Sequence, residues 1–181
     1  MRLASSALAL TLLMSASVSA APAGPRSGHR APLEAPPPRP PAAGEIQVFT
    51  PENMKWVQGP ASLPRIIRTC ILEGNPTRSG PYTLRLWLPA NTRIDPYWRS
   101  GPERLTVLIG GIWIGLGDTY SERSGPPIRA GSFAVIPARQ HHFIWTRDPT
   151  VLQLTGNGPW DIFYVNPLDD PRRAMPQSSR P

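Results

Sequence analysis

The chain has 181 residues, which is enough for one compact domain with a sizeable core. Its formal net charge is +7 at pH 7, but nearly all the positive charge comes from scattered arginines, so no nucleic-acid-binding surface is indicated. The single cysteine, Cys70, excludes an internal disulfide, and its apolar neighbours predict a small buried strand residue rather than a nucleophile.

The first 20 residues have the features of a secretory signal peptide. A basic start at Met1-Arg2 precedes an apolar stretch at 3–13, and small residues lead to Ala20. We expect cleavage after Ala20 and a periplasmic or secreted protein without a stable membrane anchor. An uncleaved anchor is the alternative, although the serine-rich second half is weakly apolar for a membrane span.

Two further segments are predicted to lie outside the folded domain. Residues 21–44 are rich in proline, alanine and arginine, and such a sequence buries too little apolar area to offset the entropy of ordering. We expect this segment to be a disordered Pro-rich linker. Residues 171–181 are expected to form a disordered tail.

Between residues 45 and 170 almost every pattern indicates β structure. Short β-rich runs are separated by Gly, Pro, Asn and Asp, which favours a closed or two-sheet all-β fold. Thr50-Pro51 resembles a helix start, so one helical turn is expected at 54–56. The expected strands cover residues 46–49, 65–72, 82–88, 93–98, 104–109, 112–116, 132–136, 141–146, 151–155 and 161–165.

The segments 95–110 and 131–142 are expected to form the two halves of a pocket. In an extended chain Tyr97 and Arg99 share one face and Trp98 takes the other. Glu103 follows a turn and opens an apolar strand, where a carboxylate is costly to bury without a partner. Arg99 and His142 are the candidate partners.

The first of these segments resembles the first motif of the cupins, which reads His-x-His, three residues, Glu, six residues, Gly. The frame falls here on Tyr97, Arg99, Glu103 and Gly110, so the spacing is kept and both histidines are replaced. The resemblance implies an all-β fold, a single cupin-type jelly-roll β-barrel over residues 45–170.

The second segment matches the second cupin motif, Gly, five residues, Pro-x-Gly, two residues, His. These positions are Gly131, Pro137, Arg139 in place of Gly, and His142. Because that Gly normally allows a positive φ, the turn at Arg139 must be of another type or carry strain.

In cupins the paired histidines, the Glu and the later His usually bind a divalent metal. Only Glu103 and His142 remain here as family-type ligands, and the fixed charge of Arg99 would repel a cation. We therefore expect no metal cofactor; the alternative is one divalent ion held by Glu103 and His142. His141 is expected to point away, since adjacent strand residues face opposite sides.

We interpret the cluster as a small-ligand site with a degenerate metal centre. Arg99 would clamp an anionic or hydroxylated ligand, Tyr97 and His142 would form hydrogen bonds, and a salt bridge from Glu103 would orient Arg99. Two further residues, Arg85 and Trp87, join this pocket if their face of the 82–88 strand lines the interior; otherwise Arg85 lies on the surface.

Three alternatives stay open. The cluster is only a satisfied polar core, or the chain is a metal-dependent cupin enzyme, such as a dioxygenase or isomerase, with an unusual ligand set. Homodimerisation is also left open, and Trp98, on the outward face, would suit an interface.

Overall fold

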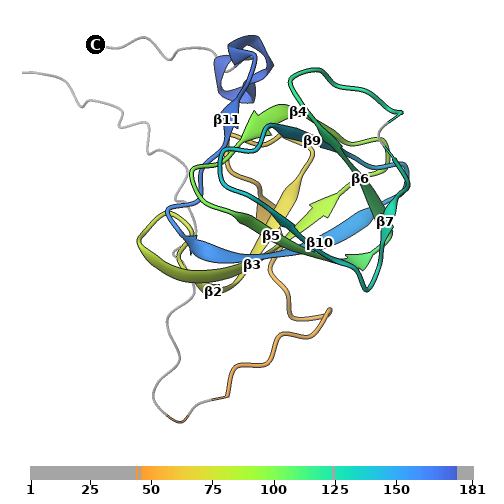
Figure 1. The fold of residues 1–181 in the computed structure, drawn as a ribbon. Coiled ribbons are helices and arrows are strands. Elements are labelled where there is room, and N and C mark those ends of the chain that lie inside the picture. The colour runs from red at the N-terminus through yellow and green to blue at the C-terminus, as the bar shows by residue number, and fades with distance from the viewer. Residues whose placement is uncertain (1–43, 45, 124, 175–181) are drawn as a thin grey trace, which may run out of the picture. The chain divides into compact units, whose positions relative to one another are not determined.

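A computed structural model describes residue 44, residues 46–123 and residues 125–174 (Figure 1). The predicted signal peptide, nearly all the predicted linker and residues 175–181 lie outside the described residues. No helix within the described ranges has the length and apolar character needed to cross a membrane.

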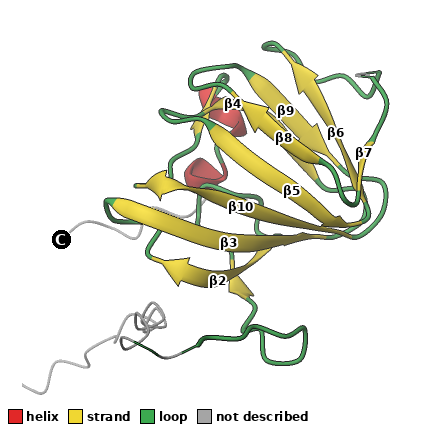
Figure 2. Cartoon of the chain, turned by 60° about the horizontal axis from the view of Figure 1, so that its bottom comes forward, coloured by secondary structure: helices red, strands yellow, loops and turns green. Residues whose placement is uncertain are grey.

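The described chain folds into two antiparallel sheets, so the all-β prediction is confirmed. Figures 1 and 2 show the sheets facing each other, with β3, β10 and β5 in one and β4, β9 and β6 in the other. The six-stranded sheet has the order β1 (Val57–Gln58), β2 (Arg68–Gly74), β3 (Gly80–Leu88), β10 (Thr150–Gly158), β5 (Glu103–Ile109) and β8 (Phe133–Ile136). The five-stranded sheet has the order β11 (Phe163–Tyr164), β4 (Arg93–Trp98), β9 (His142–Trp145), β6 (Gly111–Leu116) and β7 (Ile128–Arg129).

Alternating apolar residues of both sheets fill the space between them. On β3 the buried face carries Leu84, Leu86 and Leu88, as the period of the sequence predicts. Each such buried leucine contributes about 1.5–3 kcal/mol relative to an exposed one. The core continues through β5 and β10 and reaches the other sheet at residues such as Ile144.

The N-terminal part of the domain differs from the prediction. Residues 46–49 form no strand, and no helical turn occurs at 54–56. Asn53 donates its backbone N–H to the Thr50 carbonyl, and its side-chain Oδ1 accepts from the Thr50 N–H, which closes a turn rather than starting a helix. The chain then enters β1, which pairs with β2.

The C-terminal end is ordered further than predicted. Two short 3-10 helices, η1 (Pro167–Asp169) and η2 (Pro171–Ala174), follow β11. Arg172 in η2 donates to the Ile162 carbonyl at 3.3 Å and pairs with Asp170. Residues 171–174 therefore belong to the folded domain, contrary to the predicted tail.

Candidate functional site

A bulge in β4 aims Tyr97 into the space between the sheets. Ile94 pairs with Ile144 and Tyr97 with His142, so β4 advances three residues while β9 advances two. The extra residue reverses the inward and outward alternation, and Ile94 and Tyr97 are both buried. Pro96 lies at this irregularity, a place in a sheet where proline is found.

Tyr97 is paired with Glu103, the first residue of β5. The Tyr97 hydroxyl donates to the Glu103 carboxylate, at 3.1 Å from Oε2 and 3.3 Å from Oε1. The two side chains are 1% and 5% exposed. Burial, and then the charge of Glu103, hold the pKa of Tyr97 well above its usual range, so this phenol keeps its proton.

His142 presents an unpaired ring nitrogen to the same carboxylate. Its Nδ1 lies 2.9 Å from the Gln140 carbonyl, which can only accept, so Nδ1 carries a proton. Nε2 lies 3.4 Å from Glu103 Oε2, within ion-pair reach, yet this buried atom makes no hydrogen bond in the described part of the chain. In a neutral imidazole the Nε2 lone pair would face a carboxylate, so this contact needs either a proton shared by the two atoms or a hydrogen-bond donor beside them.

Arg99 is buried nearby but does not pair with Glu103. Its Nε donates to the Asp161 carbonyl and its Nη2 to the Tyr82 hydroxyl, both at 3.0 Å. Its Cζ lies 5.4 Å from the centre of the Trp160 ring. The predicted Arg99–Glu103 salt bridge is therefore wrong, because the Asp161 carbonyl just before β11 and the Tyr82 hydroxyl of β3 hold the guanidinium.

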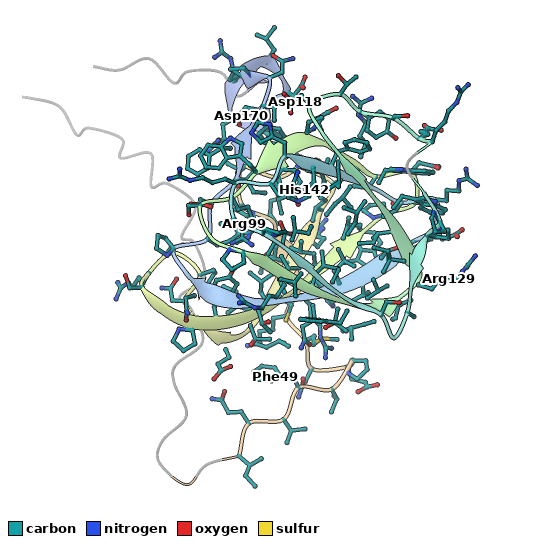
Figure 3. All side chains as sticks on the ribbon, viewed as in Figure 1. Phe49, Arg99, Asp118, Arg129, His142 and Asp170 are labelled. Carbon is teal, nitrogen blue, oxygen red and sulfur yellow. The ribbon has the colours of Figure 1, made fainter. Side chains whose placement is uncertain are left out.

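The structure brings Tyr97, Arg99 and His142 into the domain interior together with Glu103. In Figure 3, Arg99 and His142 lie among side chains between the sheets, whereas Arg129 points to the surface. We call Tyr97, Arg99, Glu103 and His142 the inner cluster.

Arg85 and Trp87 do not join the inner cluster. The leucines of β3 face the core, so Arg85 and Trp87 lie on the outer face of the six-stranded sheet. There, Arg85 donates to Gln153 Oε1 at 3.1 Å and contacts Met54 Sδ. Their face of the strand does not line the interior, so Arg85 and Trp87 lie outside the predicted pocket.

Two residues beside Arg99 were missed by the sequence analysis. Tyr82 shares the inward face of β3 with the leucines, so the period of that strand could have placed it inside. Trp160 comes from an irregular segment, and no sequence pattern pointed to it. Its indole Nε1 is buried and has no hydrogen-bond partner in the described residues.

The turn before β9 keeps the backbone of the cupin motif without its glycine. Arg139 has φ 61°, and its N–H donates to the Arg99 carbonyl at 2.8 Å. This left-handed conformation costs a non-glycine residue about 1–2 kcal/mol. His142 then points inward, while His141 pairs with Asp118 near the surface at 2.6 Å.

The inner cluster does not fit a cupin-type metal centre. No group of three or more His, Cys, Asp and Glu side chains able to hold a metal gathers in the described ranges. Glu103 and His142 offer two ligands, Tyr97 keeps its proton, and Arg99 is a permanent cation. Protein zinc sites use three or four ligands, so this donor set is too small and too positively charged.

Comparison with known proteins supports the fold. No protein-family model and no curated protein matches the chain. The polyketide cyclase RemF from Streptomyces resistomycificus superposes with a TM-score of 0.54 at 17% identity, covering 73% of this chain and 95% of its own. A candidate acetylacetone dioxygenase from Methylibium petroleiphilum PM1 gives 0.52 at 16% identity, with 70% and 85% covered.

An RmlC-like cupin from Ralstonia eutropha JMP134 gives a TM-score of 0.52 at 13% identity, covering 70% of this chain and 76% of its own. At these identities the likeness shows the fold alone. It confirms the fold that the motif spacing predicted.

Proposed function

We propose that this chain, which has the cupin fold, is a non-enzymatic protein that binds a small hydroxylated anion at the inner cluster. A short hydroxycarboxylate has the required chemistry. The observation that carries the proposal is the buried Nε2 of His142, which lacks a hydrogen-bond partner 3.4 Å from Glu103 Oε2.

The hydroxyl group follows from the two acceptors. With Nδ1 bonded to the Gln140 carbonyl, His142 offers a lone pair at Nε2, and Glu103 offers carboxylate oxygens beside it. A ligand O–H can donate to either acceptor. This hydrogen bond would reduce the repulsion between the His142 lone pair and the Glu103 carboxylate. A hydroxyl suits this place better than a metal ion because the fixed charge of Arg99 lies close by.

The unpaired donors of Arg99 and Trp160 indicate that the ligand carries an anionic group. Arg99 uses Nε and Nη2 for Asp161 and Tyr82, and its remaining N–H groups have no partner among the described residues. The buried indole N–H of Trp160 is also unpaired within that part of the chain. A carboxylate can accept from a guanidinium in the strong bidentate geometry.

Calorimetric titration with glycolate, acetate and ethylene glycol tests the two halves of the proposal. Glycolate carries both groups, acetate lacks the hydroxyl, and ethylene glycol lacks the charge. We expect glycolate to bind more tightly than either, with a change in Trp fluorescence that Trp160→Phe removes. No heat and no fluorescence change with any probe would show that the cluster is only a polar core.

Variants separate the roles of the residues. Arg99→Lys is expected to weaken glycolate and acetate about tenfold, since a point charge replaces the guanidinium fork. His142→Gln is expected to reduce the preference for glycolate over acetate and to leave acetate binding unchanged. Arg85→Gln is the matched control, because Arg85 lies on the outer face and its loss should change neither affinity.

Metal analysis tests the catalytic alternative. Protein purified without chelators should contain no stoichiometric divalent metal. Iron, manganese, nickel or zinc bound by the wild type and lost in both Glu103→Ala and His142→Ala would overturn the proposal in favour of a metal-dependent enzyme. The proposal includes export after cleavage at Ala20, which N-terminal sequencing of protein recovered outside the cytoplasm tests.

A further inference from the structure

A cavity lies apart from the inner cluster. Its volume is about 380 Å³, within the range of small-molecule sites. Three segments line it: residues 91–93 at the start of β4, residues 145–147 at the end of β9, and the loop that carries Tyr120 and Glu122. We call it the outer pocket.

The outer pocket and the inner cluster use opposite faces of β9. His142 and Ile144 alternate with Phe143 and Trp145 along the strand, and Ile144 belongs to the central core. Trp145 therefore lies on the outer face of the five-stranded sheet. It pairs there with Trp113 of β6, and the two rings stack with centroids 4.2 Å apart.

Trp145 carries a buried hydrogen-bond donor with no partner. The residue is 4% exposed, lines the outer pocket, and has no acceptor for its indole N–H in the described chain. The indole nitrogen can only donate. A ligand that brings an acceptor to this nitrogen would satisfy it.

The charges of the pocket favour an anion. The Cζ of Arg147 lies 5.0 Å from the Trp113 ring centre and 5.2 Å from that of Trp145, and no acidic partner is found for it in the described residues. Arg93 pairs with Asp95 and covers Tyr120, so its charge is partly offset. Glu122 is the lining carboxylate and opposes an anion.

The neighbouring hydroxyls are already satisfied. Those of Thr92 and Thr146 both donate to the Pro89 carbonyl, at 2.7 and 2.9 Å. The Trp145 N–H, the Arg147 guanidinium and the Asn91 carboxamide thus remain as donors, beside the aromatic side chain of Tyr120.

We propose that the outer pocket binds a planar aromatic carboxylate. The carboxylate accepts from the Trp145 N–H and pairs with Arg147, while the ring contacts Tyr120 and the apolar body of Trp145. This site requires neither the inner cluster nor its ligand.

Titration of ¹⁵N-labelled full chain with 1-naphthoate tests the proposal by NMR. We expect saturable movement of the assigned Trp145 indole signal. 1-Naphthalenemethanol, which has the same ring and no charge, should bind at least about tenfold more weakly. Acetate, which has the charge and no ring, should not move the signal.

Charge variants on exposed residues provide the decisive control. Arg147→Gln should weaken 1-naphthoate about tenfold, and Glu122→Gln should strengthen it, while neither changes binding of 1-naphthalenemethanol. Arg104→Gln, an exposed arginine on β5 in the other sheet, should have no effect. A Trp145 signal unmoved by 1-naphthoate, or equal affinity in wild type and Arg147→Gln, would overturn the proposal.

Discussion

The two faces of β9 place different chemical demands on a ligand. On the inner face, His142 directs an acceptor nitrogen toward a carboxylate, so the missing group is a proton or a donor. On the outer face, Trp145 lines a cavity together with Arg147 and its buried N–H has no partner, so the missing group is an acceptor. Both nitrogens are buried and unpaired within the described residues. A ligand group that satisfies one nitrogen would not satisfy the other, because His142 needs a donor and Trp145 needs an acceptor. An unpaired buried atom therefore indicates a ligand's chemistry only once its protonation state has been derived from its neighbours.

The largest predicted effect is the loss of the inner carboxylate. Glu103→Ala should lower the free energy of unfolding by about 3–5 kcal/mol, because it leaves a buried partner uncompensated. Replacing both groups, as in Glu103→Leu with His142→Leu, should restore most of this stability while removing ligand binding. Urea unfolding measures the free energy of unfolding of the single and the double variant. Glu73→Ala on β2 is the matched surface control, and a Glu103→Ala protein as stable as that control would show that the Glu103 carboxylate does not stabilise the inner cluster.

The outer layer can be disrupted by one methyl group. A Cβ at Gly115 would lie 1.9 Å from the Phe143 ring, which covers this position and packs on Tyr120. Gly115→Ala should cost about 1–3 kcal/mol by overpacking. It should also disturb the outer pocket through Tyr120, while the inner cluster keeps its glycolate affinity. Gly101→Ala, where a Cβ meets nothing within 4 Å, should be nearly neutral in thermal unfolding.

The inner tyrosine should make stability sensitive to alkali. The folded-state pKa of Tyr97 is raised by burial and then by Glu103, so its stabilising contribution is complete below about pH 10 and is lost as pH rises further. Tyr97→Phe should cost about 1 kcal/mol at neutral pH. It should also flatten the decline of stability above about pH 10, measured by urea unfolding across pH.

Tyr120→Phe on the outer side is the comparison for this test. Burial also raises the pKa of Tyr120, but this residue is far less enclosed than Tyr97. A smaller flattening is therefore expected. Identical alkaline profiles for wild type and Tyr97→Phe would contradict the assignment of Tyr97 as a protonated donor.

The smallest effect concerns the loops that border the two sites. Arg139, in the turn before β9, has φ 61°, and Asn91, which lines the outer pocket, has φ 57°. Arg139→Gly should raise the free energy of unfolding by about 0.5–1 kcal/mol, because glycine adopts this conformation without strain. Asn91→Gly should change it less, since asparagine tolerates the left-handed region. A destabilised Arg139→Gly would show that the Arg139 side chain contributes more than its strain costs.

The sequence predicts the inner site better than its surroundings. The alternation in β3 predicts the leucine core, and the motif spacing places Glu103 and His142 in the interior. The contact of Arg99 with Asp161 was not predictable, because that carbonyl lies 62 residues away and depends on how the chain returns beside β4. The outer pocket was missed for the same reason: three distant segments close it, and none carries a motif.

The bulge in β4 has a consequence for how the gene can vary in length. Removing one residue at Asp95 or Pro96 would remove the bulge and leave Ile94 and Tyr97 two positions apart, so both would still face inward in a regular strand paired with β9. Losing both residues would make Ile94 and Tyr97 neighbours and turn one of them outward. Homologous chains that keep the inner cluster should therefore lack at most one residue here.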